Sequence, residues 1–250
     1  MHEFLEGGRD GIYIEENYVF RPAEFWTEHV HLYLKYLHSE GFNKVPFPFG
    51  IDNDGIEKIS YVEGNVYNEL LPEEVKSDET LISFCTLIKQ FHDIGEKYIE
   101  NLTGKEQWML PVRTPIETMC HGDLAPYNVT VNGKKAIGII DFDTLHPGPR
   151  MWDISYSLYR WIPLMSPDNP ENFGNEDDKH RRLDLFIRTY GLNDKDNKKI
   201  IKYVIQRLEY LISFMEIEAE NGNITFRQHI EDGHLTQYRR DLNYIESNWG

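Results

Sequence analysis

Residues 120–153 read CHGDLAPYNVTVNGKKAIGIIDFDTLHPGPRMWD, and this stretch holds polar side chains in an order that chance rarely produces. His121 and Asp123 come first, Asn128 follows that aspartate by five residues, and Asp141 ends an apolar run. A carboxylate placed directly after a buried strand is costly unless it binds something. Each of these features is weak alone, but their joint order and spacing mark a candidate site.

A β-hairpin is predicted within the stretch. Two short apolar runs, 129–131 and 136–140, flank the turn sequence Asn132-Gly133-Lys134. A hairpin returns the chain on itself. We therefore expect Asn128 and Asp141 to lie side by side, although thirteen residues separate them.

The residue types suit phosphoryl transfer to a hydroxyl group. That reaction needs a carboxylate to orient the hydroxyl, oxygen ligands for Mg²⁺ on the nucleotide phosphates, and a rigid loop to carry them. Asp123 can orient the acceptor, Asn128 and Asp141 offer hard oxygen ligands, and Pro126 stiffens the loop.

The segment resembles the family of aminoglycoside and choline kinases, phosphotransferases related to protein kinases. His121 to Asn128 resembles the catalytic loop H-x-D-x-x-x-x-N, and Asp141 resembles the metal-binding aspartate that follows. The resemblance implies that Asp123 is the catalytic residue and that Asn128 and Asp141 bind Mg²⁺.

Three further residues receive supporting roles from the same resemblance. His121 corresponds to the loop histidine, which is mostly structural. Asp143 is a second acid near the metal or the substrate. Asp153 resembles a helix aspartate that braces the catalytic loop through its backbone.

The remaining chain fits an α+β, two-lobed, protein-kinase-like fold. We expect a reduced, β-rich N-lobe over residues 1–62, which covers the nucleotide. Residues 63–250 would form a larger, mainly helical C-lobe with the catalytic loop, the metal site and the acceptor site. Two short strands are predicted around a polar turn at 15–17, and apolar spacing predicts helices at 25–37 and 81–95 and one final helix at about 225–247.

ATP or GTP is the expected phosphate donor. Residues 56–64 resemble the last N-lobe strand and the hinge, where backbone groups of Tyr61, Val62 and Glu63 would bind the base. Arg21 stands where the family has a phosphate-binding lysine, and Glu24 or Glu28 would be its partner. The glycines between residues 7 and 11 are a weak signal for a phosphate-covering loop.

The net charge of the chain limits the classes of molecule that it is expected to bind. The chain has 250 residues and a formal net charge of −16, which disfavours nucleic acid and attracts cations. An aminoglycoside-like acceptor, and hence a role in antibiotic resistance, is our first expectation. Acids on the late helices could bind such a cation: Glu209, Glu216, Glu218, Glu220, Asp232 and Asp241.

A cytoplasmic protein without a membrane span is expected. No apolar run approaches the ~18 residues that a span needs, and the N-terminus does not look like a signal peptide. Cys85 and Cys120 are too few for a disulfide framework. The sequence does not predict the oligomeric state.

Two alternatives remain open at this point. The chain could be a non-catalytic, kinase-like module that binds a ligand and confers immunity, which the short N-lobe and the missing lysine favour. The complete set of Asp123, Asn128 and Asp141 disfavours it. A metal-dependent hydrolase has less support, because it leaves the N-terminal strands unexplained.

Overall fold

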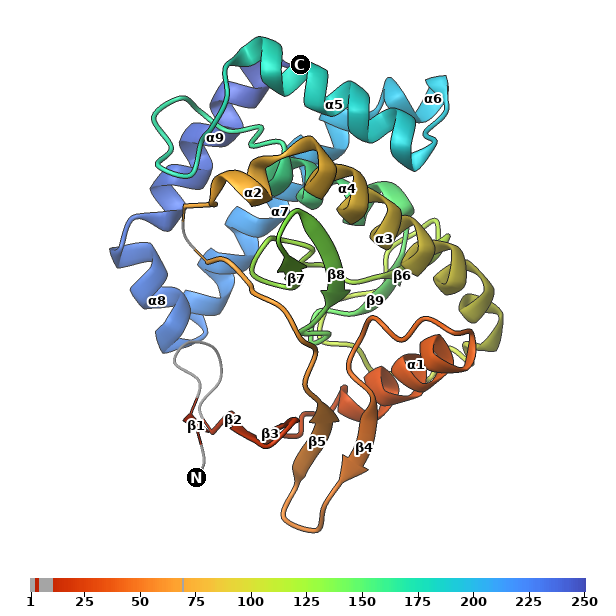
Figure 1. Ribbon diagram of the computed structural model, residues 1–250. Coiled ribbons are helices and arrows are strands. Elements are labelled where there is room, and N and C mark those ends of the chain that lie inside the picture. Colours follow the sequence, from red (N-terminus) through yellow and green to blue (C-terminus); the bar gives the residue numbers. More distant parts are fainter. Residues whose placement is uncertain (1–2, 5–10, 69) are drawn as a thin grey trace.

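A small antiparallel sheet forms the N-terminal part of the computed structural model, which describes residues 3–4, 11–68 and 70–250. The sheet, here called the front sheet, has the strand order β1-β2-β3-β5-β4. Figure 1 shows it below the helices, with α1 beside it. Its elements are β1 (Glu3–Phe4), β2 (Tyr13–Glu15), β3 (Tyr18–Pro22), α1 (Thr27–Ser39), β4 (Pro48–Ile51) and β5 (Ile56–Ser60).

Two tight turns set the register of the front sheet. Glu16 takes a φ of 55° between β2 and β3, where the sequence predicted a polar turn. Between β4 and β5, Asp52 Oδ1 accepts hydrogen bonds from the backbone N–H groups of Asp54 and Ile56, both at 2.9 Å. In the neighbouring ladder, β3 pairs with β5 so that Arg21 lies opposite Glu57.

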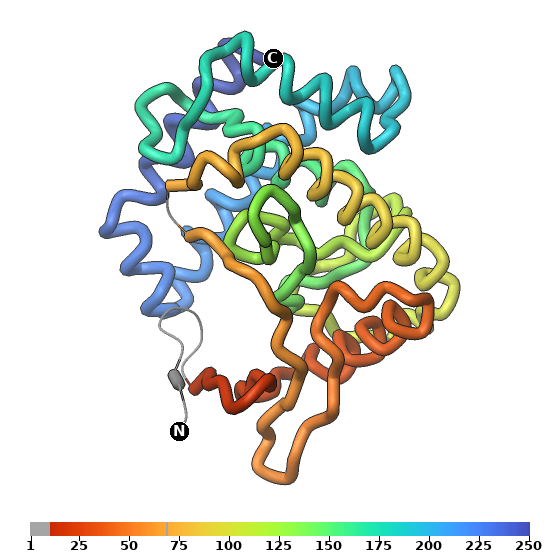
Figure 2. The backbone as a smooth tube through the Cα atoms, viewed as in Figure 1, coloured from red at the N-terminus to blue at the C-terminus, as the bar shows by residue number. Residues whose placement is uncertain are grey.

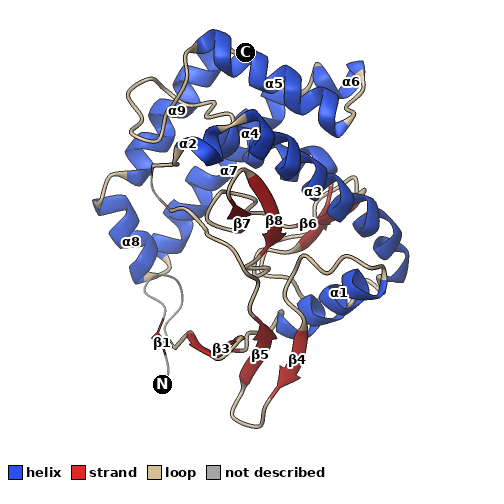
Figure 3. Ribbon diagram, in the orientation of Figure 1, coloured by secondary structure: helices blue, strands red, loops and turns tan. Residues whose placement is uncertain are grey.

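Helices make up most of the remaining chain, here called the helical body (Figure 3). Its helices are α2 (Glu73–Lys76), α3 (Asp78–Tyr98), the 3₁₀ turn η1 (Ile99–Asn101), α4 (Arg150–Trp161), α5 (Glu176–Tyr190), α6 (Asp194–Asn197), α7 (Ile200–Glu220), α8 (Ile224–Glu231) and α9 (His234–Asn248). Ser77 caps α3 by accepting from the Thr80 N–H. The buried face of α3 packs against α1 through Tyr33 and Phe91, whose ring centroids lie 5.7 Å apart.

Two short β-ladders lie between α3 and α4 and carry the catalytic segment. Their strands are β6 (Thr118–Cys120), β7 (Val129–Asn132), β8 (Lys135–Ile139) and β9 (His146–Gly148). The ladder β7–β8 is the predicted hairpin, whereas the pairing of β6 with β9 was not predicted. Because Val129 and Thr130 are buried between the layers, the loop in front of them is held on a rigid base.

The predicted final helix is wrong in one respect, since the chain forms two helices there. The break falls at Gly233, which has a φ of 90°. That left-handed conformation cannot continue an α-helix and suits glycine best. The turn sends α9 back against α7, where Ile245 is fully buried.

The structure therefore has the α+β class that the sequence predicted, with a small sheet followed by a larger helical part. Figure 2 shows that the segment after β5 leads from the front sheet to the helical body. The boundary at residues 62–63 stays a prediction. Gly7 and Gly8 of the weak glycine cluster lie outside the described residues. Among the described residues, no helix is both long and apolar enough to cross a membrane.

Candidate active site

The loop between β6 and β7 fixes the carboxylate of Asp123. Tyr127 donates its hydroxyl to Asp123 Oδ1 at 2.8 Å, and Asn128 Nδ2 donates to Oδ2 at 2.9 Å. Asn128 Nδ2 also donates to the Asp123 carbonyl at 2.9 Å. Burial, together with the Asp123 charge, raises the pKa of Tyr127 well above its ordinary value. Tyr127 therefore stays a hydrogen-bond donor to the carboxylate.

The hairpin places Asn128 beside Asp141, as its geometry predicted. Val129 pairs with Ile139 at the base of the ladder, and the Ile140 N–H donates to the Asn128 carbonyl at 2.9 Å. Asp141 follows with a φ of 59°, and its side chain is half-exposed. Phe142 is buried, so the chain turns the carboxylate of Asp141 outward and anchors the next residue in the core.

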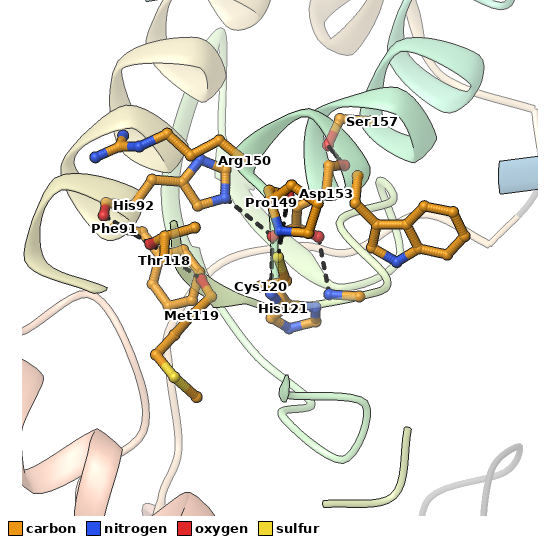
Figure 4. A network of polar contacts seen from close by, with 12 residues as sticks. Phe91, His92, Thr118, Met119, Cys120, His121, Pro149, Arg150, Asp153 and Ser157 are labelled. Carbon is orange, nitrogen blue, oxygen red and sulfur yellow. Dashed lines mark hydrogen bonds and ion pairs between the residues drawn. The ribbon is translucent and has the colours of Figure 1, made fainter. Parts of the chain in front are cut away.

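Asp153 on α4 anchors the backbone of the catalytic loop (Figure 4). Its carboxylate accepts hydrogen bonds from the backbone N–H groups of His121 at 2.7 Å and Gly122 at 2.8 Å. It also contacts His92 Nε2 at 3.0 Å. Burial opposes ionisation of Asp153, but the hydrogen bond and charge of His92, with the loop amides, hold its pKa below the ordinary value. The loop backbone is thus pinned to a buried carboxylate.

His121 is fully buried and uses both ring nitrogens within the loop. Nε2 lies 2.9 Å from the Ile140 carbonyl oxygen, and Nδ1 accepts from the Asp123 N–H at 3.2 Å. This pattern fixes the neutral tautomer with the proton on Nε2. His121 therefore joins the catalytic loop to the end of the hairpin, which is a structural task.

Arg21 reaches across from the front sheet to the acids of the helical body. Its Nη1 lies 3.1 Å from Asp141 Oδ1, and its Nη2 lies 3.2 Å from Asp143 Oδ1. Asp143 Oδ1 also accepts from the indole of Trp26 at 3.2 Å. The guanidinium thus bridges β3 and both aspartates that follow β8.

The carboxylate that positions Arg21 is Glu57, rather than Glu24 or Glu28 as the sequence suggested. Arg21 Nε donates to Glu57 Oε1, and His31 Nε2 lies 2.7 Å from Oε2. Burial opposes ionisation of Glu57, but its bonds to His31 and Arg21 keep its pKa below the ordinary value. The partner is a strand residue because β5 pairs directly with β3, whereas Glu24 and Glu28 are exposed.

The predicted hinge residues follow β5. The Tyr61 N–H donates to the Asn17 carbonyl at 2.8 Å, so this group is already used within the front sheet. Val62 lies close to Gly138, where an added Cβ would meet Val62 Cγ1 at 2.5 Å. Tyr61 and Glu63 are exposed. A base bound there would meet the backbone of Val62 and Glu63.

A cavity of about 890 Å³ opens beside Asp123, on the side of α4, α7 and the α8–α9 turn. Asp123 and Gly122 lie at its edge. Aromatic side chains form much of its wall: Tyr127, Tyr156, Tyr159, Tyr210, Phe214, Phe226 and Tyr238. A small molecule in this cavity would have direct access to the Asp123 carboxylate.

The donor set fits a magnesium ion that also binds phosphate. Asn128 uses its amide nitrogen toward Asp123, which leaves the amide oxygen for a cation, and Asp141 offers a half-exposed carboxylate. In the part of the chain that is described, no group of three or more His, Cys, Asp or Glu side chains could hold a metal alone. Two protein oxygens are what Mg²⁺ takes when phosphates and water complete its shell.

Several residues of the site were not singled out from the sequence. Glu57 looks like an ordinary strand residue, and His31 looks like part of an amphipathic helix. Tyr127 lies within the motif and could have been noticed, because a hydroxyl four residues after an aspartate can return to it. Arg207, on α7, donates to the Gly122 carbonyl at 2.8 Å, and no local signal marks it.

Comparison with known proteins agrees with this geometry. Residues 96–186, which include the catalytic loop, the hairpin and Asp153, match the model described as "Phosphotransferase enzyme family". The predicted resemblance and the predicted class of enzyme, a phosphotransferase, are confirmed at this level. No curated protein matches the sequence.

Solved structures confirm the kinase-like fold. A choline/ethanolamine kinase family protein from Mesorhizobium loti has a TM-score of 0.59 and 12% identity, covering 99% of this chain and 93% of that chain. Choline kinase LicA from Streptococcus pneumoniae has a TM-score of 0.57 and 15% identity, covering 99% and 94%. An amicoumacin kinase, solved with AMP-PNP and Ca²⁺, has a TM-score of 0.64 and 14% identity, covering 92% and 88%.

Proposed function

We propose that this protein, whose residues 96–186 match a family of phosphotransferase enzymes, is a small-molecule kinase. It transfers the γ-phosphate of a magnesium-bound nucleotide to a hydroxyl group of an acceptor in the 890 Å³ cavity. The observation that carries this proposal is the position of Asp123. Its carboxylate borders the cavity on one side and binds Asn128, the neighbour of Asp141, on the other.

Each residue has a defined task in this proposal. Asp123 accepts a hydrogen bond from the acceptor hydroxyl and orients its oxygen toward the γ-phosphate, while Tyr127 holds the carboxylate in place. Asn128 and Asp141 bind Mg²⁺, which would neutralise charge on the phosphate oxygens. Arg21 binds the phosphates, and the backbone near Val62 and Glu63 binds the base. Asp153 and His121 keep the loop rigid, and Asp143 orients Arg21.

The more detailed parts of the proposal are the identity of the nucleotide, the identity of the acceptor, and the cellular role and location of the protein. The similar structures include kinases for choline, ethanolamine and amicoumacin, and an aminoglycoside phosphotransferase with streptomycin and ATP. They support a nucleotide donor and a hydroxyl-bearing small molecule. An aminoglycoside-like acceptor, a role in antibiotic resistance and a cytoplasmic location stay predictions from the sequence.

Calorimetric titration with Mg-ATP and Mg-GTP tests the proposal. We expect one of the two to bind the wild-type protein in a metal-dependent manner. Asp141→Asn should lose that dependence and phosphoryl transfer while staying folded. Asp168→Asn, which removes an equal charge from an exposed loop residue, is the matched control and should bind as the wild type does.

Two outcomes would contradict the assignment. Unchanged metal-dependent binding by Asp141→Asn would exclude that residue as a ligand. Failure of the wild type to bind either nucleotide, with or without acceptor candidates, would favour the alternative of a non-catalytic binding module. The comparisons give that alternative no support.

A further inference from the structure

The large cavity is lined by three acids, Asp123, Glu171 and Asp232, and by two arginines, Arg160 and Arg207, so it is not the strongly acidic surface expected for a polycationic acceptor. Of the six late-helix acids considered for that task, Asp232 lines the cavity. Asp241 is fully buried and accepts hydrogen bonds from Tyr159, Asn169 and Gln237, so it belongs to the core. Two of the others lie elsewhere, since Glu216 and Glu220 line a separate hollow between α7 and α8.

Arg207 lines the same cavity next to the catalytic loop. It is 6% exposed, and its Nη2 donates to the Gly122 carbonyl at 2.8 Å, one residue from Asp123. Within the described chain, its Nε and Nη1 have no hydrogen-bond partner. A buried guanidinium with unused donors is costly, because its charge and N–H groups have lost water without full compensation.

The neighbours of Arg207 are rings and another cation. Its Cζ lies 4.5 Å from the ring centroid of Tyr156 and 5.3 Å from that of Trp152. Arg113 stacks on rings of the same cluster, with its Cζ 3.5 Å from the Trp152 centroid and 4.2 Å from that of Tyr210. Rings attract a cation through their faces, but they accept no strong hydrogen bond from its N–H groups.

Arg160, the other arginine of the cavity wall, differs from Arg207 in having an acid as its charge partner, although its Nε also has no hydrogen-bond partner among the described residues. Its Nη1 lies 2.6 Å from Glu171 Oε2, and both residues line the cavity. No ion pair of this kind joins Arg207 to an acid in the described residues. Its positive charge is therefore available to an anionic group of a bound molecule. Its position would place that anion within a few bonds of a hydroxyl held by Asp123.

We propose that the acceptor carries a carboxylate that binds Arg207, so that the substrate class is a hydroxy acid with an apolar or aromatic body. This inference rests on the kinase function proposed above. A carboxylate is favoured over a phosphate because Asp123 and the γ-phosphate already place negative charge nearby. One guanidinium can neutralise a monoanion and bind it with two parallel hydrogen bonds. The aromatic wall supplies the contact area for the body.

Three small probes of one shape test this inference by calorimetry without nucleotide. They are 4-(hydroxymethyl)benzoate, its primary amide, and 4-(hydroxymethyl)benzylamine, which differ in charge at one position. We expect the wild type to bind the carboxylate about tenfold or more tightly than the other two, as a charge-assisted hydrogen bond implies. Arg207→Gln should lose that preference, and Arg207→Lys should keep part of it.

Arg239→Gln is the matched control. Arg239 is an exposed residue of α9 that pairs with Glu216, and its replacement changes the net charge by the same amount. We expect this variant to keep the wild-type preference for the carboxylate. A loss of preference in both variants would mean a general charge effect and would overturn the assignment to Arg207.

The wild-type comparison decides the proposal even if Arg207→Gln does not fold. Equal binding of the three probes, tighter binding of the amine, or no binding at millimolar concentration overturns a carboxylate subsite. The proposed kinase function fails by a different result, namely absent nucleotide binding. Asp141→Asn should separate the two sites, because it should lose metal-dependent nucleotide binding and keep the carboxylate preference.

Discussion

Arg21 and Glu57 face each other across β3 and β5, and this pair connects the front sheet to the candidate metal site. Glu57 is 1% exposed and also contacts His31, whereas the far end of Arg21 reaches Asp141 and Asp143. The carboxylate therefore aims the guanidinium. An arginine with its Nε fixed can still offer both Nη groups to phosphate oxygens.

Replacing Glu57 should affect both folding and nucleotide binding. Glu57→Gln removes the buried carboxylate of this pair and leaves Arg21 with only Asp141 and Asp143 as charge partners, and breaking a buried pair costs about 3–5 kcal/mol. We expect a loss of this order in urea unfolding and weaker nucleotide binding in calorimetry. The double variant Arg21→Met/Glu57→Leu should lose less stability than the sum of the single variants. Additive losses would show that the pair is not coupled.

Tyr127 should affect turnover more than binding. Tyr127→Phe removes one hydrogen bond to the Asp123 carboxylate, a type of bond worth roughly 1.5–3 kcal/mol. We expect kcat to fall about tenfold or more, with the nucleotide Kd unchanged. Tyr159→Phe is the matched control. The Tyr159 hydroxyl donates to the buried Asp241, so this change should lower the free energy of unfolding rather than kcat. Equal kcat values for Tyr127→Phe and the wild type would refute this positioning role.

Asp153 should be required for the geometry of the catalytic loop. Asp153→Asn replaces one of the two oxygens that accept the His121 and Gly122 N–H groups with an amide donor. Displacement of a reacting group by about 1 Å can cost 10²-fold in rate, so we expect a loss of that order in transfer. Ser157→Ala on the same helix removes a weaker contact to the Asp153 carbonyl and should stay close to wild type. A fully active Asp153→Asn variant that unfolds as the wild type does would contradict this expectation.

His146 should make the fold sensitive to mild acid. Burial lowers its pKa from 6.5 to about 4. Because the folded pKa lies below the unfolded one, the unfolded chain binds the proton first as the pH falls. Stability should then decrease between pH 6.5 and about 4, by up to roughly 3 kcal/mol.

Urea unfolding at several pH values down to about 4.5 measures this loss. Glu57 and Asp153 have lowered pKa values, so their contributions are lost at lower pH, below the ordinary carboxyl range. His146→Gln should show a shallower decrease over the window than the wild type. An identical decrease in both proteins would assign the effect to other groups.

The sequence alone determined the catalytic segment. Asp123, Asn128 and Asp141 lie in one stretch joined by a hairpin, and hairpin geometry depends on the turn and the alternation of nearby residues. The two long helices of the first hundred residues, α1 and α3, were predicted for the same reason, because apolar spacing is a local property. The final helix was predicted as one because the break at Gly233 depends on how α9 packs on α7.

The tertiary structure decided which residues surround that segment. Glu57 meets Arg21 through strand pairing 36 residues apart, and Arg207 meets Gly122 across 85 residues. No periodicity encodes such contacts, since the first forms when β3 pairs with β5 and the second when α7 docks against the catalytic loop. The spacing of residues in the sequence therefore identified the reacting groups. The packing of distant elements decided which residues position those groups and which charges line the acceptor cavity.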